Sequence, residues 1–118
     1  MSAKITNEYG TVSIDNEVIS RIAGLAAMDC YGIVGMAIKN VKDGFVQLLK
    51  RESLTKGINL VVDENKVSLD FHIIVEYGTN ISAIADNLIN TVKYKVEDTI
   101  GLQVEEINIF VEGVRVDN

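Results

Sequence analysis

The sequence contains no proline and no tryptophan, and it has a single cysteine, Cys30, and a single histidine, His72. One cysteine excludes an internal disulfide and a zinc site built only from cysteines of this chain. No apolar run approaches the roughly 20 residues that a membrane-spanning helix needs. The N-terminal segment lacks the apolar stretch of a signal peptide, so we expect a cytoplasmic protein that does not insert directly into a membrane.

Positive charge is also scarce. The chain has 11 Lys and Arg residues against 17 Asp and Glu residues, a net charge of −6, which disfavours general binding to nucleic-acid backbones. The balance is uneven, because residues 1–58 carry +1 and residues 59–118 carry −7. A basic segment contains Lys42, Lys50 and Arg51, which we assign as a candidate patch for an acidic partner or a membrane surface, the alternative being an ordinary solvated face.

The length of 118 residues is enough to bury one hydrophobic core. No stretch rich in proline, glycine and serine marks a flexible linker. We therefore expect residues 1–118 to form a single domain.

Hydrophobic periodicity predicts both helices and strands. A short strand at 11–14 precedes a helix that begins at an Asp15 or Asn16 cap and ends near Met28. A second, shorter amphipathic helix is expected over Val41–Glu52, where apolar residues recur at helical spacing. From Gly57 the period changes to two, which predicts a hairpin of strands at 58–62 and 67–75.

The remaining residues complete the domain. Thr79 or Asn80 caps a long helix that ends at Gly101, and Ile107, Ile109 and Val111 form the inward face of a last strand. The predicted order is β-α-(α)-β-β-α-β. This order indicates an α+β fold with a single small mixed or antiparallel sheet and two main amphipathic helices on one of its faces.

Evidence for catalysis is weak. His72 lies on the less buried face of its predicted strand, and no nucleophile is spaced to work with it. Cys30 is most simply a small buried side chain at the end of the first helix. Phosphate-binding P-loop, HExxH and GxSxG motifs are absent. We expect no enzyme activity, no metal and no cofactor.

The segment Gly32-Ile33-Val34-Gly35 is a G-x-x-G sequence, the pattern with which KH modules clamp a nucleic-acid backbone. Its centre is apolar, and few basic residues follow it. A structural role for Gly32 and Gly35, in a tight chain reversal, is therefore favoured. A KH-like nucleic-acid-binding module using this loop is kept as the alternative.

Three segments together resemble the alkaline-shock-protein family of Gram-positive bacteria, the envelope stress response proteins. Residues 10–37, GTVSIDNEVISRIAGLAAMDCYGIVGMA, are similar to the strand, helix and glycine turn with which members begin. Residues 69–104, LDFHIIVEYGTNISAIADNLINTVKYKVEDTIGLQV, resemble a V-x-Y-G strand with its following helix and exit. Residues 106–116, EINIFVEGVRV, are similar to the closing strand.

The resemblance implies a non-enzymatic cytoplasmic scaffold or adaptor that supports cell-envelope homeostasis. In relatives this role goes with self-association and with recruitment to the membrane by a partner protein that is itself anchored. Better-known members carry long charged tails, whereas this chain resembles the short form without them.

The sequence also supplies a candidate surface for self-association. Val61, Ile74 and Phe110 are apolar at positions that alternation assigns to the sheet face opposite the helices. We expect this face to join copies of the chain into a homo-oligomer. The alternative is that the segment Val41–Glu52 or a terminus folds over the face and covers it.

Overall fold

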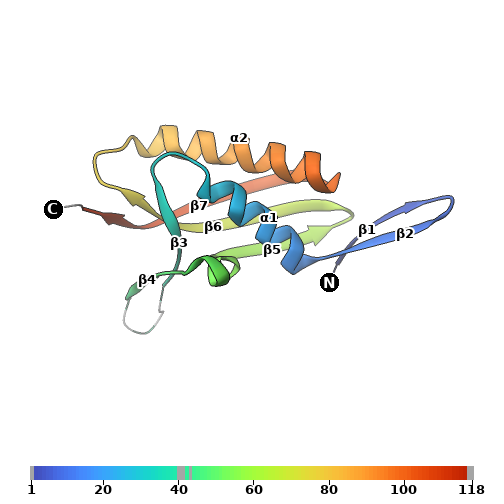
Figure 1. Ribbon diagram of the computed structural model, residues 1–118, viewed down its shortest axis with the longest axis horizontal. Helices are drawn as coiled ribbons and strands as arrows, with labels where there is room; N and C mark the ends of the chain where they lie inside the picture. The colour runs from blue at the N-terminus through green and yellow to red at the C-terminus, as the bar shows by residue number, and fades with distance from the viewer. Residues whose placement is uncertain (1, 40–41, 43, 117–118) are drawn as a thin grey trace.

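The computed structural model describes residues 2–39, 42 and 44–116 and confirms an α+β fold (Figure 1). Its elements in chain order are β1 (Ser2–Asn7), β2 (Gly10–Asp15), α1 (Asn16–Met28), β3 (Ile33–Lys39), β4 (Val46–Leu48), the 3₁₀ helix η1 (Arg51–Gly57), β5 (Ile58–Asp63), β6 (Lys66–Glu76), α2 (Ile81–Ile100) and β7 (Gln103–Arg115).

The main sheet is organised around β6. One edge of β6 pairs antiparallel with β5 along residues 66–71 and with β3 along residues 73–75. The other edge pairs with β7, which runs parallel over the whole length of β6. The sheet is therefore mixed, and β4 extends it beyond β3.

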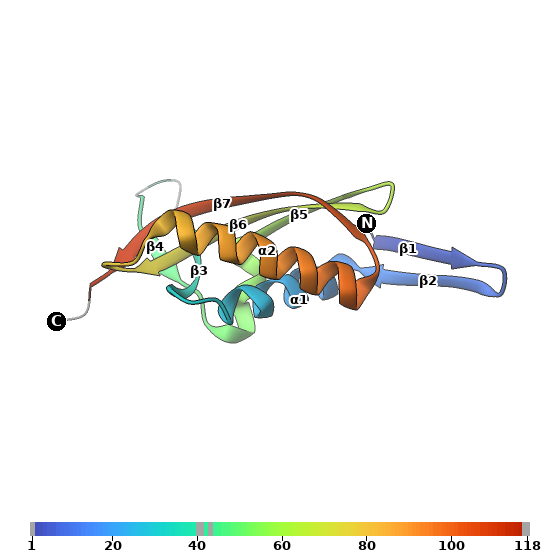
Figure 2. The same cartoon turned by 90° about the horizontal axis from the view of Figure 1, so that it is seen from above.

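Both long helices cover the same face of this sheet, as the sequence predicts (Figure 2). The face of β6 beneath them carries alternate apolar residues that are at most 1% exposed: Val67, Leu69, Phe71, Ile73 and Val75. Above them, α1 buries small residues such as Ala23 and Ala27, which allow close approach, and α2 buries larger ones such as Leu88 and Val92. The hydrophobic core lies between these two layers.

Local signals account for the element ends. The Asp15 side chain accepts a hydrogen bond from the Glu17 amide at the start of α1, and the Asn80 side chain accepts one from the Ala83 amide at the start of α2. Gly101 ends α2 in the left-handed conformation, with φ of +83°. Glu64 and Asn65 also have positive φ. They form the two-residue turn that joins β5 and β6 in a tight hairpin.

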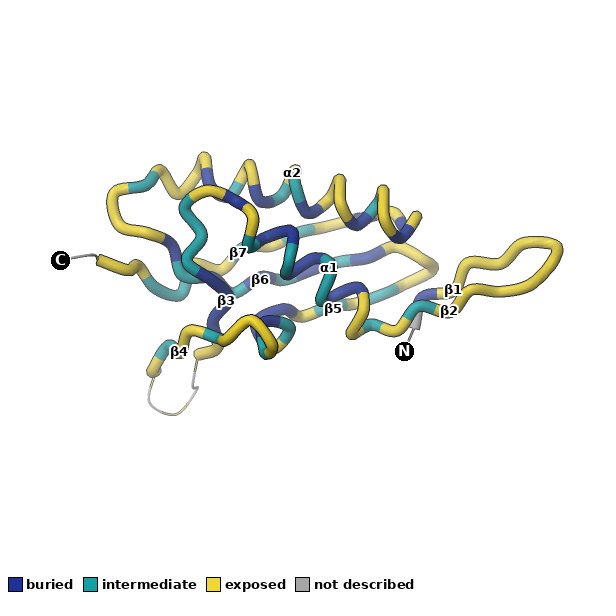
Figure 3. The backbone as a smooth tube through the Cα atoms, viewed as in Figure 1, coloured by how far each residue is buried: buried dark blue, intermediate teal, exposed yellow. Residues whose placement is uncertain are grey.

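The N-terminal hairpin of β1 and β2 forms a separate two-stranded sheet, so the expectation of a single sheet was incomplete. It projects from the body as an arm, and most of its residues are exposed (Figure 3). The arm lengthens the molecule to 58 Å and contributes to a radius of gyration of 15.1 Å, above the value of about 13.5 Å typical of this chain length. Buried Ala3 anchors its base.

The predicted helix over Val41–Glu52 was wrong. Val41 lies outside the described residues, Val46–Leu48 form strand β4, and a helix of 3₁₀ type begins only at Arg51. The apolar spacing fits a helix, but Gly44 interrupts it with φ of +75°, a left-handed conformation that a continuous right-handed helix cannot contain. The strand β3, which precedes this segment and pairs with both β4 and β6, was not predicted.

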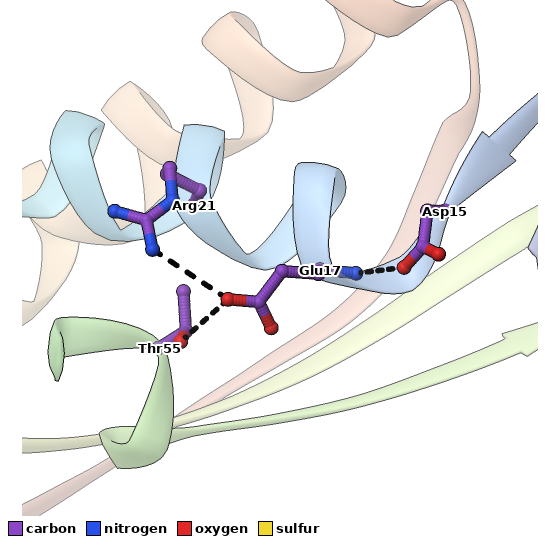
Figure 4. Close-up of polar contacts among 4 residues, drawn as sticks. All are labelled: Asp15, Glu17, Arg21 and Thr55. Atoms are coloured by element: carbon purple, nitrogen blue, oxygen red, sulfur yellow. Dashed lines mark hydrogen bonds and ion pairs between the residues drawn. The ribbon is translucent and has the colours of Figure 1, made fainter. Parts of the chain in front are cut away.

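Side chains of α1 hold η1 in place (Figure 4). The Glu17 carboxylate accepts a hydrogen bond of 3.1 Å from the Thr55 hydroxyl and lies 3.6 Å from the Arg21 guanidinium. Leu54, which is 1% exposed, packs against α1 at Gly24. A Cβ atom at Gly24 would lie 2.3 Å from Leu54 Cδ1 and 3.0 Å from Ile58 Cδ1, so this glycine permits the close approach.

The substitution Gly24→Ala tests this packing. We expect a net loss of about 1–2 kcal/mol in the free energy of unfolding, because overpacking a buried site outweighs the gain of about 1 kcal/mol from alanine in a helix. Urea denaturation measures the change. In a Leu54→Val background the same substitution should be close to neutral, whereas a Gly24→Ala protein as stable as the wild type would contradict the proposed contact.

Candidate functional site

The sheet face opposite the helices, here called the open face, is the candidate site. Because side chains alternate along a strand, the residues of β6 between the buried ones point away from the core. Ser68, Asp70, His72 and Ile74 are all partly exposed there. The strand register places Val61 of β5 opposite Ser68 and Phe110 of β7 opposite His72.

His72 is the centre of a polar network on the open face. Its Nδ1 lies 2.7 Å from Glu112 Oε2, and its Nε2 lies 3.3 Å from Asn59 Nδ2. With hydrogen on Nδ1, the ring donates to the Glu112 carboxylate and accepts from the Asn59 amide, so both ring nitrogens are satisfied. Phe110 stacks on the imidazole, with ring centroids 4.9 Å apart and an interplanar angle of 14°.

An irregularity in β7 brings Glu112 to His72. Val111 pairs with Ile73 and Gly113 pairs with Ile74, so Glu112 is an extra residue in the ladder. Such a bulge re-aims a side chain without ending the strand. Nearby, the Asn108 side-chain amide donates a 2.9 Å hydrogen bond to Asp70. The middle of the open face is therefore polar and held by hydrogen bonds.

The three residues assigned to self-association differ in exposure. Val61 is 63% exposed and Phe110 is 45% exposed. Ile74 is partly buried. A Cβ atom at Gly113 would lie 3.8 Å from Ile74 Cγ1 and 3.9 Å from Val46 Cγ1, so β4 passes close to this part of the face. The open face is accessible at Val61 and Phe110 and less so at Ile74.

A shallow hollow of about 240 Å³ adjoins the network. His72, Glu112 and Asn59 line it together with Lys39 and Lys56. The hydrogen-bond partners of the imidazole are the Asn59 amide and the Glu112 carboxylate, and neither is a hydroxyl or a thiol. The hollow therefore presents polar and charged side chains to any group that enters it.

Cys30 lies away from this network, in the core at the end of α1. It is 6% exposed, and its Sγ donates to the Ala26 carbonyl at 3.6 Å. Burial raises the pKa of the Cys30 thiol, the negative charge of Asp29 raises it further, and a hydrogen bond with Thr91 acts in the opposite direction. The reactive thiolate is therefore disfavoured.

Gly32 and Gly35 occupy different environments. Gly32 lies in the turn after α1 with φ of +84°, and a Cβ there would collide with the Ile84 side chain. Gly35 is not a turn residue: it is buried within β3, at an irregularity in the pairing with β6. The G-x-x-G segment thus joins a helix to a strand, and its last three residues belong to β3.

The basic residues predicted to lie on a second helix are spread over two other segments of the chain. Lys50 precedes η1 and Arg51 begins it, while Lys42 lies in the segment before β4. All three are exposed. Lys50 lines a hollow beside Lys56, a residue that was not part of the predicted patch.

Within residues 2–39, 42 and 44–116, no group of three or more His, Cys, Asp or Glu side chains is arranged to hold a metal ion. In the same described part of the chain, no helix combines the length and the apolar character required to cross a bilayer.

Glu112 and Asn59 were missed by the sequence analysis. Glu112 is 40 positions from His72, and strict alternation in β7 from Phe110 does not reveal a bulge. A hydrophobic strand interrupted by Glu112-Gly113 was the available signal, since glycine inside a strand is typical of a bulge.

Proteins of similar sequence align with this chain over nearly its whole length. The uncharacterized protein YloU of Bacillus subtilis is 49% identical over 119 residues, which cover 100% of this chain and 99% of that protein. The uncharacterized protein Spy1614 of Streptococcus pyogenes is 32% identical over 98% of this chain and 97% of its own length. A stress response regulator gls24 homolog of the same species is 30% identical over 90% of this chain and 59% of its own length.

Among solved structures, a MamM-CTD variant has a TM-score of 0.50 at 13% identity and covers 88% of this chain and 100% of its own. That likeness concerns the fold alone. The model of the alkaline shock protein 23 family, described as having a cell envelope-related function, matches residues 4–116. The chain belongs to this family.

Proposed function

We propose that this protein is a non-catalytic scaffold or adaptor within the cell envelope-related function of its family, and that it acts by self-association and contact with other proteins. The observation that carries the proposal is the open face, where Val61 and Phe110 are exposed on the side of the sheet that neither α1 nor α2 covers. Exposed apolar side chains rimmed by polar ones are typical of protein interfaces.

The polar network favours recognition because it fixes the aromatic side chain. Phe110 stacks on His72, and His72 is itself held by Glu112 and Asn59. A side chain that is already ordered loses less conformational entropy on binding. Phe110 is therefore the expected anchor of the self-association face, with Val61 as a second exposed apolar contact on β5 and Ile74 in a lesser role.

The absence of catalysis is also part of the proposal. His72 has two satisfied ring nitrogens and no hydroxyl or thiol among its hydrogen-bond partners. Cys30 is buried elsewhere, and the pKa of its thiol is raised by burial. These two residues were the candidates for acid–base or nucleophilic chemistry, and their surroundings support a structural role for both.

The name of the gls24 relatives supports a role in stress response, which we extend to this chain as part of the proposal. The family resemblance implies a membrane-anchored protein as a further partner, and hence a cytoplasmic location beside the membrane. The KH-like alternative has less support, because Gly35 is buried in β3 rather than exposed in a phosphate-binding loop.

The substitution Phe110→Glu tests the self-association face. We expect it to convert the oligomer to the 12.9 kDa monomer, because a carboxylate buried between two copies lacks a partner to offset its desolvation. Multi-angle light scattering measures the mass in solution.

Tyr94→Glu is the matched control, since Tyr94 is an exposed aromatic residue on α2, away from the open face. It should leave the mass unchanged. A monomeric wild type, or a Phe110→Glu protein with the wild-type mass, would contradict self-association through this face.

The environment of Cys30 predicts slow thiol chemistry. Below the ordinary pKa of a thiol, a raised pKa in the folded state leaves even less thiolate than in the unfolded chain, and burial limits access to it. At pH 8 we expect a disulfide reagent such as DTNB to modify the folded protein more slowly than the urea-unfolded protein by about tenfold or more. Equal rates in the two states would show that Cys30 is accessible and reactive.

A further inference from the structure

A second surface of the molecule lies around β4, where three hollows of about 330, 240 and 260 Å³ adjoin one another. Ile38 lines all three of them, while Lys39 and Lys56 each line two. We define the β4 surface by six residues of this region: Ile38, Lys39, Phe45, Leu48, Lys50 and Lys56.

The β4 surface exposes large apolar side chains. Phe45 is 74% exposed, Leu48 is 44% exposed and Ile38 is 41% exposed. Ile38 and Leu48 belong to the paired strands β3 and β4, so the sheet holds their backbones in place. Apolar side chains gathered around adjoining hollows are a feature of sites that bind another chain.

The charge of the β4 surface is opposite to that of the whole protein. Lys39, Lys50 and Lys56 line its hollows, whereas the chain carries a net charge of −6. Among the residues that the structure describes, the acidic side chains near this surface are Glu52, in the first turn of η1, and Glu112, which lines one of the hollows and is hydrogen-bonded to His72. A local positive region on an acidic protein selects partners that carry negative charge.

The backbone of β4 offers a further means of recognition. Among the described strands, β4 is the last in the order β4-β3-β6-β5 and pairs only with β3. The outer edge of such a strand can accept an additional strand from another chain. Lysines beside an edge oppose pairing with basic or neutral strands and leave pairing with an acidic strand favourable.

We propose that the β4 surface binds an extended acidic peptide segment of a partner protein. The segment adds as a strand along the outer edge of β4. Its apolar side chains contact Phe45 and Leu48, and its carboxylates pair with Lys39 and Lys50. This site is separate from the self-association face at Val61 and Phe110, so it goes beyond the function proposed above.

The test uses the full chain and a phage library of random peptides of about 12 residues, long enough to extend along β4 and its flanks. We expect the selected peptides to combine acidic and apolar residues. Their affinity, measured by fluorescence anisotropy, should fall by about tenfold or more in Lys50→Glu, because a charge-assisted contact is replaced by repulsion. Phe45→Ser should weaken binding similarly by removing the apolar contact.

Matched controls come from exposed positions of α2. Lys93→Glu and Tyr94→Ser change a lysine and an aromatic residue outside the β4 surface, and both should bind like the wild type. The Phe110→Glu variant should also keep peptide binding, which separates this proposal from that of self-association. All variants are checked for folding by circular dichroism.

Three results would overturn the proposal. One is a selection that yields no acidic peptides. Another is an equal loss of affinity in Lys50→Glu and Lys93→Glu, which would indicate attraction by overall charge alone. The third combines two observations: the protein binds no peptide, and it floats with phosphatidylglycerol vesicles unless Lys50 is replaced. That result would assign the surface to a membrane.

Discussion

The central strand β6 is the constraint on which the rest of the structure depends. Its 11 residues pair with β7 along one edge and with β5 and then β3 along the other. Its strict alternation sends Phe71 and Ile73 under the helices and His72 and Ile74 to the open face. Since a slip of one residue would exchange these two sets, burial of the apolar set fixes the register of every neighbouring strand. The same register decides which polar side chains meet on the open face.

Departures from regular pairing add what alternation alone cannot produce. The bulge that contains Glu112 gives β7 an extra residue and brings a carboxylate to the imidazole of His72. The irregularity near Gly35 lies where β3 joins β6, and β3 continues from there to pair with β4. The open face and the β4 surface thus both lie beside a local irregularity, one in β7 and one in β3. Such irregularities bend a strand and change the direction of its side chains.

The sequence predicted the parts of the fold whose signals are local. The caps at Asp15 and Asn80, the apolar stripe of α2 and the turn between β5 and β6 are all encoded within a few residues. Prediction failed between Ile33 and Gly57, where β3 depends on pairing with residues about 40 positions away and Gly44 interrupts a helical pattern. For the site, alternation predicted that Val61 and Phe110 face away from the helices. The partners of His72 were not predictable, because a bulge moves Glu112 out of the expected alternation.

The positions of the two surfaces have a consequence for how an adaptor of this size would work. Lys56 lines both the hollow beside His72 and Glu112 and the hollow beside Leu48 and Lys50, so the open face and the β4 surface share a boundary. An extended peptide on the outer edge of β4 would lie along that strand and leave Phe110 accessible. A second copy seated on Phe110 and Val61 would in turn bring its own charge close to Lys56. Because the chain carries a charge of −6, assembly would place negative potential beside the lysines and reduce their attraction for an acidic segment. Binding at the two surfaces is therefore expected to be linked through electrostatics even where the two partners do not touch.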